Sequence, residues 1–278
     1  MPPPAHGDLP FAALVPFLLL TFVLAWGLLA VFLLFQEHLA RVFGPISARH
    51  PLFILAVYAP AIAAFTVVAA HAGLAGLRRF LSRLLLYRTT PGWYAFVLLG
   101  IPLAYAGGAL LKGSKLMDLL ALPEAGALLA TMAFMLVLGP VEEFGWRGVA
   151  LPLLQRRLKP ARAGLALGLV WGVWHLPAFF LGGTPQSQWG FLPFLAGAVA
   201  VSVIVTAMFN ASRGSILLAA LFHFQLNNPL WPDGQPHDAI IFAVAAGAVL
   251  WFNRGAMFSR AGAVTVVVPR PALVTAAS

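Results

Sequence analysis

Two adjacent glutamates lie in an apolar stretch of the chain, in the segment GPVEEFGWR at residues 139–147. Neighbours on a helix point about 100° apart, so Glu142 and Glu143 face different partners. Glu143 precedes Arg147 by four residues, which is the favourable order for an ion pair. This pair leaves Glu142 without a counter-charge, and such a group at membrane depth is a candidate functional residue. The alternative is that both acids belong to a structural ion network.

Two histidines and one asparagine are the other candidate groups. His175 lies in the segment WGVWHLP (171–177), and His223 precedes Asn227 by four residues in LFHFQLNN (221–228). His223 and Asn227 therefore share a helix face. Taken alone, each histidine also suits a hydrogen-bonded core position. Counting 1.5 Å per residue, Glu142, His175 and His223 lie about 13 to 20 Å from the basic ends of their helices, so they share one depth. This common depth favours a single site.

These residue types are typical of a hydrolase. A carboxylate beside an imidazole can hold and deprotonate a water molecule, while a second imidazole and a carboxamide can donate hydrogen bonds to a developing oxyanion. Glu142, His175 and His223 also offer three ligands to Zn²⁺, which lowers the pKa of a bound water to about 7. Metal-activated and glutamate-activated water both remain open.

Other intramembrane hydrolase chemistries find no support in the sequence. The His-Glu-x-x-His motif of zinc proteases is missing, and no Gly-x-Ser-x-Gly segment is present. The chain has no cysteine, which excludes thiolate catalysis and disulfides. The four aspartates lie near helix ends or in loops, at Asp8, Asp118, Asp233 and Asp238. A serine, cysteine or aspartyl mechanism is therefore not indicated.

The composition places the candidate residues in a membrane-embedded bundle. Only 9% of the 278 residues are charged and 61% are hydrophobic, whereas a soluble domain is about 25% charged. A crossing needs about 20 apolar residues. The gaps between charged residues predict spans at approximately 11–35, 52–71, 93–111, 125–145, 163–181, 191–209, 214–230 and 238–252.

The predicted fold class is all-α, a polytopic membrane protein with about eight transmembrane helices around an intramembrane cavity. The uncharged run Leu9–Gln36 is interpreted as a retained first span, and the fourth helix can continue toward Gln155. A turn at residues 182–185 divides the uncharged stretch after Arg162. We expect a single domain over residues 1–278. The tail at 255–278 gives no structural prediction, since its segment from Ala261 suits a short strand as well as disorder.

Lysine and arginine are distributed unequally between the two sides of the predicted bundle. The odd-numbered loops hold four, and the even-numbered loops with the tail hold twelve: Arg78, Arg79, Arg83, Arg88, Arg156, Arg157, Lys159, Arg162, Arg213, Arg254, Arg260 and Arg270. This bias favours both termini in the cytoplasm. The basic residues behind the net charge of +9 are then expected mainly on the side that faces anionic lipid. Membrane lipid is an expected partner and nucleic acid is not, because no basic-aromatic module is visible.

Three motifs, in this order, resemble those of the CPBP family of intramembrane metalloproteases. This family includes the type II CAAX prenyl endopeptidases and bacteriocin-processing or self-immunity (Abi-like) proteins. Its patterns are Glu-Glu-x-x-x-Arg, here residues 142–147; Phe-x-x-x-His, here 171–175; and His-x-x-x-Asn, here 223–227. All three lie within a core at 125–228. The departure is Trp171 in place of Phe, which keeps an aromatic wall beside His175 but would narrow the site.

The resemblance implies a fold, a mechanism and a location. The fold is an eight-helix bundle with a cavity reachable from the cytoplasm, in the cell (inner) membrane of a prokaryote. The implied roles are water activation by Glu142 and His175, oxyanion stabilisation by His223 and Asn227, and support of these four by Glu143, Arg147 and Trp171. A divalent metal such as zinc would bind Glu142, His175 and His223; a metal-independent glutamate mechanism is the alternative.

The expected activity is that of an intramembrane endopeptidase acting on a membrane-associated or lipidated peptide or protein. The prenylated CAAX type and the bacteriocin-like type of substrate both remain open, and the oligomeric state is not indicated. Two rival functions remain. One is a non-catalytic immunity or adaptor protein that binds a peptide or partner in the same cavity. The other is a proton-coupled transporter, which is the weaker because no paired broken helices are visible.

Overall fold

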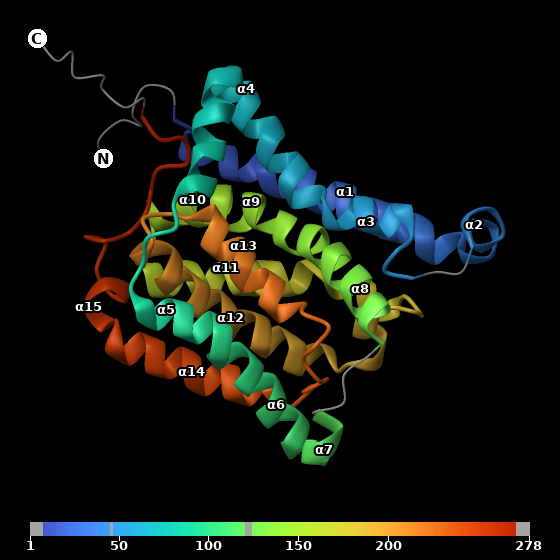
Figure 1. Ribbon diagram of the computed structural model, residues 1–278. Helices are drawn as coiled ribbons and strands as arrows, with labels where there is room; N and C mark the ends of the chain where they lie inside the picture. Colours follow the sequence, from blue (N-terminus) through green and yellow to red (C-terminus); the bar gives the residue numbers. More distant parts are fainter. Residues whose placement is uncertain (1–7, 45–46, 120–123, 271–278) are drawn as a thin grey trace, which may run out of the picture.

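The computed structural model describes residues 8–44, 47–119 and 124–270 (Figure 1). Within these ranges the chain forms helices and no β-strand. In the described part of the chain, six helices are long and apolar enough to cross a membrane: Phe11–Leu34, Ala59–Leu85, Pro91–Leu111, Ala125–Gln155, Pro160–Phe180 and Phe191–Ala211. Two shorter apolar helices are Ile216–Leu226 and Asp238–Phe252. The predicted all-α polytopic membrane fold is confirmed, although the last two helices are shorter than the about 20 residues of a full crossing.

The helices follow one another along the chain with short connections. They are α1 (Leu14–Leu34), α2 (Gln36–Phe43), α3 (Pro51–Val57), α4 (Ala59–Leu81), α5 (Pro91–Ala95), α6 (Ile101–Leu111), α7 (Leu116–Leu119), α8 (Ala125–Leu138), α9 (Glu143–Gly145), α10 (Leu151–Gln155), α11 (Pro160–Trp174), α12 (Phe191–Ala211), α13 (Ile216–Leu226), α14 (Asp238–Phe252) and α15 (Arg254–Met257). In Figure 1 the long helices run roughly from left to right, with α10 and α15 at one end and α2 and α7 at the other.

Helix α12 is the most buried of the six long helices and packs against α11 and α14. Along the α11 side, Gly164, Gly168 and Gly172 repeat every fourth residue, and a Cβ on any of them would lie 2.4–2.9 Å from an atom of α12. Small residues at this spacing let membrane helices approach closely. This close packing fixes the depth of α11 and hence of the two site residues at its end, Trp171 and His175.

Two helix breaks lie where the backbone takes a left-handed conformation. Gly73, with φ of 63°, interrupts α4, so the apolar part of that helix ends close to the predicted end of the second span. Gly183, with φ of 84°, lies in the turn between α11 and α12, as predicted for residues 182–185. Glycine adopts these φ values without steric cost.

The fourth long helix is continuous but irregular at the Glu-Glu motif. After α8, a 3₁₀ turn covers Pro140–Glu142, α9 follows, and a π-helical turn covers Trp146–Ala150 before α10. The expected continuation toward Gln155 is therefore present, with altered helical pitch. Such departures from the α-helical repeat change the direction of nearby side chains and are frequent at functional sites.

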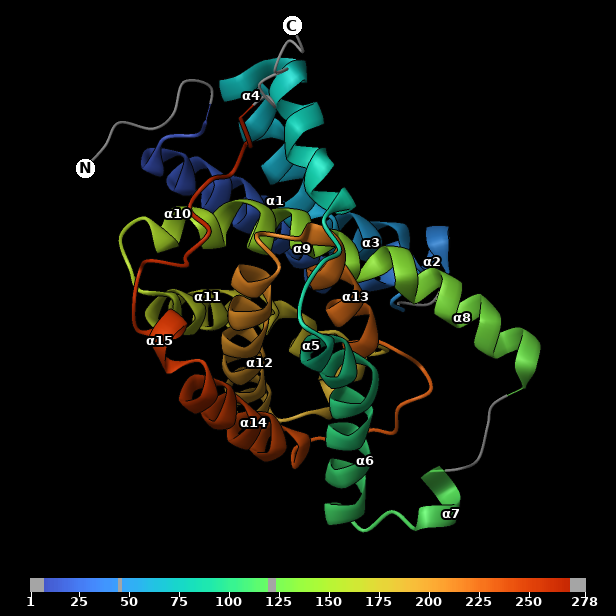
Figure 2. The ribbon, with the colours of Figure 1, turned by 60° about the vertical axis from the view of Figure 1, so that its left-hand side comes forward.

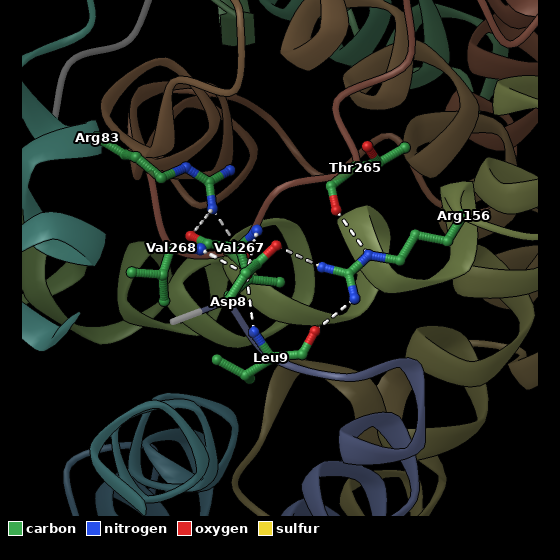
Figure 3. A network of polar contacts seen from close by, with 8 residues as sticks. Asp8, Leu9, Arg83, Arg156, Thr265, Val267 and Val268 are labelled. Atoms are coloured by element: carbon green, nitrogen blue, oxygen red, sulfur yellow. Dashed lines mark hydrogen bonds and ion pairs between the residues drawn. The ribbon is translucent and has the colours of Figure 1, made fainter. Parts of the chain in front are cut away.

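A polar network holds the two described ends of the chain together (Figure 3). Asp8 Oδ1 accepts hydrogen bonds from the backbone N–H groups of Val267 and Val268, at 3.1 and 3.0 Å. Asp8 Oδ2 forms an ion pair with Arg156 at 2.7 Å, and Arg156 Nε donates to the Thr265 carbonyl at 2.8 Å. Burial lowers the pKa of Arg156, while the charge of Asp8 acts in the opposite direction.

Arg83 extends the same network to two further segments. It donates to the carbonyls of Gly148, Gly214 and Val267 at 2.8, 2.9 and 3.2 Å. The chain beyond α15, up to Arg270, therefore packs against the bundle, with Val267 and Val268 buried. It forms no strand, and residues 271–278 lie outside the described part of the chain.

Candidate functional site

A cavity of about 380 Å³ lies within the bundle, and its wall is mainly apolar. Four of the predicted catalytic residues line it: Glu142, His175, His223 and Asn227. They come from the fourth long helix, the end of α11, and α13 with the residue that follows it. Trp171 also lines the cavity, whereas Glu143 and Arg147 lie behind it in the wall. Three helices thus bring these groups to one cavity, and the catalytic roles of the residues stay predictions.

Glu142 is buried, with 4% of its surface exposed. Its Oε2 accepts hydrogen bonds from two indole N–H groups, Nε1 of Trp171 at 2.9 Å and Nε1 of Trp146 at 3.3 Å. Its Oε1 has no hydrogen-bond partner among the residues that the structure describes. One oxygen of this carboxylate is thus held by the protein, and the other is free to accept a proton.

Glu143 contacts two basic side chains, Arg147 behind the cavity wall and His223 in its lining. Its Oε1 pairs with Arg147 Nη1 at 2.9 Å and with His223 Nδ1 at 2.7 Å. The predicted ion pair with Arg147 is present, and both side chains are almost fully buried. The contact with His223 was not predicted. It fixes the orientation of that imidazole, because an ionised carboxylate can only accept hydrogen bonds and so holds the Nδ1 proton.

His175 lies where α11 ends as an α-helix. Its Nδ1 is 2.8 Å from the backbone carbonyl of Trp171. A carbonyl only accepts, so this bond places the proton on Nδ1 and leaves the lone pair of a neutral ring on Nε2. The rings of Trp174 and Phe194 pack edge-on against His175. The imidazole therefore has one orientation and one available nitrogen.

Asn227 and His223 meet the fourth helix at Gly139. A Cβ at Gly139 would lie 1.9 Å from Asn227 Nδ2 and 3.0 Å from His223 Nε2. The carboxamide and the free imidazole nitrogen are therefore neighbours, in a space that only a residue without a side chain leaves open. Two hydrogen-bonding groups that converge in this way can stabilise an oxyanion.

Sequence reasoning missed two residues of the site, Trp146 and Gly139. Trp146 follows Glu142 by four residues, and this spacing is a signal that could have paired them. Gly139 precedes Glu142 by three residues, but its role depends on how closely α13 approaches, which no local pattern encodes. Both residues complete the surroundings of Glu142 and Asn227.

The predicted metal ligands Glu142, His175 and His223 line the same cavity. Across residues 8–44, 47–119 and 124–270, no group of three or more His, Cys, Asp or Glu side chains is placed to hold a metal ion. A zinc site at Glu142, His175 and His223 stays a prediction.

Comparisons with known proteins point to one family. Residues 124–228 match the family model described as type II CAAX prenyl endopeptidase Rce1-like. This range coincides with the predicted core at 125–228 and contains all three motifs. The chain is also 33% identical to a protein of Methanococcus maripaludis named CAAX prenyl protease 2, over 46% of this chain and 52% of that protein. The chain thus spans about half the length of this curated relative.

Proposed function

We propose that the chain is an intramembrane endopeptidase, because residues 124–228 match the family model of the Rce1-like type II CAAX prenyl endopeptidases. It hydrolyses a peptide bond of a membrane-associated substrate, with the prenylated CAAX type favoured by the name of the relative. The observation that carries the proposal is the lining of one apolar cavity by Glu142, His175, His223 and Asn227. Residues 1–278 form one membrane domain in this proposal, and the core at 125–228 carries the chemistry.

Glu142 is the base that activates water. Its Oε1 has no protein partner in the described structure and faces a site that excludes most solvent, since the residue is 4% exposed. A water bound between Oε1 and the lone pair on His175 Nε2 would be oriented by both groups. Proton transfer to the carboxylate then produces the nucleophile that attacks the scissile carbonyl. The same proton can pass to the leaving amine when the tetrahedral intermediate collapses.

Asn227 and His223 receive the negative charge that develops on the carbonyl oxygen. Asn227 Nδ2 is a donor in every protonation state. Glu143 orients the imidazole of His223 through its contact with Nδ1 at 2.7 Å, so that Nε2 faces the cavity beside Asn227. In this proposal the oxyanion is held between the Asn227 carboxamide and the His223 imidazole, as in preorganised sites of acyl transfer.

The test is cleavage of a quenched fluorescent, farnesylated peptide that ends in a CAAX sequence, by the full-length protein in lipid nanodiscs. Glu142→Ala should lower kcat by about 100-fold to 10,000-fold, because general-base catalysis contributes this much. His223→Ala should lower kcat by about 100-fold to 1,000-fold. The matched controls are Glu37→Ala and His38→Ala, two exposed residues on α2, and both should cleave at the parent rate.

Cleavage by Glu142→Ala at the parent rate would overturn the proposed mechanism. A parent protein that binds the peptide without cutting it, with binding retained in Glu142→Gln, would instead identify the adaptor function. The peptide without its farnesyl group tests whether the lipid is required. Activity measured before and after chelation and zinc addition tests the predicted metal.

A further inference from the structure

Two buried tryptophans donate to the same oxygen of Glu142. Trp171 and Trp146 donate to Oε2 at 2.9 and 3.3 Å. An indole N–H can only donate, so the direction of both bonds is defined. Trp171 is 5% exposed and Trp146 is fully buried. Both bonds therefore lie in a dry environment, where a hydrogen bond to a carboxylate is strong.

We propose that Trp146 and Trp171 form an indole clamp that orients the Glu142 carboxylate and leaves Oε1 as the only oxygen able to accept the proton of water. The inference rests on the proposed function, in which Glu142 is the base. Neither tryptophan touches the reacting atoms in this scheme. Both are positioning residues that act through Glu142.

The rings that make up the indole clamp are themselves held in place. The guanidinium of Arg147 lies over the Trp171 ring, with Cζ 4.8 Å from its centroid. The Trp146 ring packs edge-on against Phe17 and Trp174, at 5.9 and 5.8 Å between centroids. These contacts oppose rotation of either indole, so its N–H points at Oε2 before substrate enters. Preorganisation of this kind keeps a catalytic group within the narrow range of productive geometry.

A substitution at residue 171 can distinguish an indole that holds Glu142 from an aromatic ring that only fills space. Phenylalanine, which occupies this position in the family pattern, would keep a ring beside His175 and His223 but has no N–H. Trp171→Phe therefore removes one hydrogen bond to Glu142 and preserves most of the apolar surface. If the clamp orients the base, this change lowers kcat and leaves KM nearly unaltered, since it acts on the chemical step and not on binding.

A spectrum of the indole N–H groups tests the clamp without any measurement of activity. The chain has eight tryptophans, so full-length protein labelled with ¹⁵N-indole in detergent micelles gives eight assignable cross-peaks. Trp146→Phe, Trp171→Phe and Trp251→Phe identify three of them. Glu142→Ala should move the indole proton resonances of Trp146 and Trp171 upfield, because an anionic acceptor is lost. The resonance of Trp251, which is exposed on α14, should stay unchanged.

The indole clamp would be overturned if neither the Trp146 nor the Trp171 resonance moved further than the Trp251 resonance. Glu142→Gln gives the same test if the alanine variant does not fold. It keeps the shape of the side chain but replaces the anionic acceptor with a neutral one, so both resonances should move upfield by a smaller amount.

Kinetics with the farnesylated peptide provide the second readout. Trp171→Phe should lower kcat about tenfold, which is the rate equivalent of one hydrogen bond to a charged group, with KM changed less than about twofold. The matched control is Trp26→Phe, which removes an indole bond of 3.1 Å to the Trp174 carbonyl, on the same helix as Trp171. It should keep the parent kcat.

The positioning role of Trp171 would be overturned if Trp171→Phe kept the parent kcat, or if Trp26→Phe lost as much kcat as Trp171→Phe. A parent protein that cuts no peptide would count against the proposed function, and the indole spectrum would still decide the clamp.

Discussion

Glu143 contacts two basic side chains through a single oxygen, and this geometry links the stability of the site to its chemistry. The carboxylate lies 2.9 Å from Arg147 and 2.7 Å from His223, with 1–2% of the Glu143 and Arg147 side chains exposed. Charges buried this deeply are tolerated only when they are paired. The arrangement therefore places Arg147 as the permanent counter-charge of Glu143, while the same carboxylate oxygen orients the His223 imidazole.

Removal of Arg147 alone should destabilise the fold. Arg147→Met leaves Glu143 as a buried charge without its permanent partner, which should lower the free energy of unfolding by about 3 kcal/mol. The double variant Glu143→Gln with Arg147→Met removes both charges. Its free energy of unfolding should fall by less than half of the loss in Arg147→Met. Unfolding by sodium dodecyl sulfate in mixed micelles measures both values. Equal losses in the single and double variants would contradict a coupled pair.

The residues of the site differ in how far the sequence predicts them. Glu142, His175, His223 and Asn227 stand out because polar groups are rare in apolar helices, and the structure places all four around one cavity. The hydrogen bond from Trp146 is harder to predict, because it lies where a 3₁₀ turn gives way to a π-helical turn. Spacing rules assume a regular α-helix, and the helix is irregular at this position.

At the scale of the helices, two glycines of the fourth long helix have different tasks. A Cβ at Gly139 would meet the end of the Asn227 side chain, at 1.9 Å, and the His223 ring. A Cβ at Gly145 would meet the backbone of Pro60 in α4, at 2.6 Å from its carbonyl oxygen. A flexible amide can move away from a new methyl group, whereas a packed helix backbone cannot. Gly139 therefore serves the site, and Gly145 serves the packing of α9 on α4.

Alanine substitution should separate these two tasks. Gly139→Ala should fold like the parent and lose kcat by about 100-fold, because displaced Asn227 no longer contacts the oxyanion. Gly145→Ala should lower the free energy of unfolding by about 1 to 3 kcal/mol, through overpacking against α4. Peptide cleavage and unfolding in mixed micelles are measured on both variants. Full activity in Gly139→Ala would contradict the placement of Asn227 in the site.

The positions of the helices were largely predictable, and their internal breaks were not. Scarce charge marks roughly where each apolar segment starts and ends. Six of the predicted segments overlap the six long apolar helices of the described chain, and the other two overlap the shorter helices Ile216–Leu226 and Asp238–Phe252. The break at Gly73 and the short helix α2 escaped prediction. Both lie where the chain leaves the apolar layer, and hydropathy gives little information about backbone direction there.

At the scale of the molecule, the network around Asp8, Arg83 and Arg156 gathers segments that the loop count assigned to one side. Asp8 precedes the first span, Arg83 and Arg156 follow the second and fourth, and their partners Gly214 and Val267 follow the sixth and eighth. Both described ends and all three even-numbered loops therefore lie on one face of the bundle. In Figures 1 and 2, α7 lies far from this face, beyond the end of α6. The tail could not be predicted from its sequence, since its order comes from contacts with Asp8 and Arg156.

The excess of basic residues on this face predicts which side of the membrane it occupies. Twelve lysines and arginines against four favour a cytoplasmic location for the network face and for both termini. Because the chain has no cysteine, single cysteines report their accessibility without background. A membrane-impermeant maleimide added to intact spheroplasts should label Met117→Cys on α7, an exposed position. Thr90→Cys and Ala261→Cys, exposed positions near the network face, should react only after lysis. The opposite pattern would invert the orientation, and labelling of all three in intact cells would contradict a shared face for the even-numbered loops and the tail.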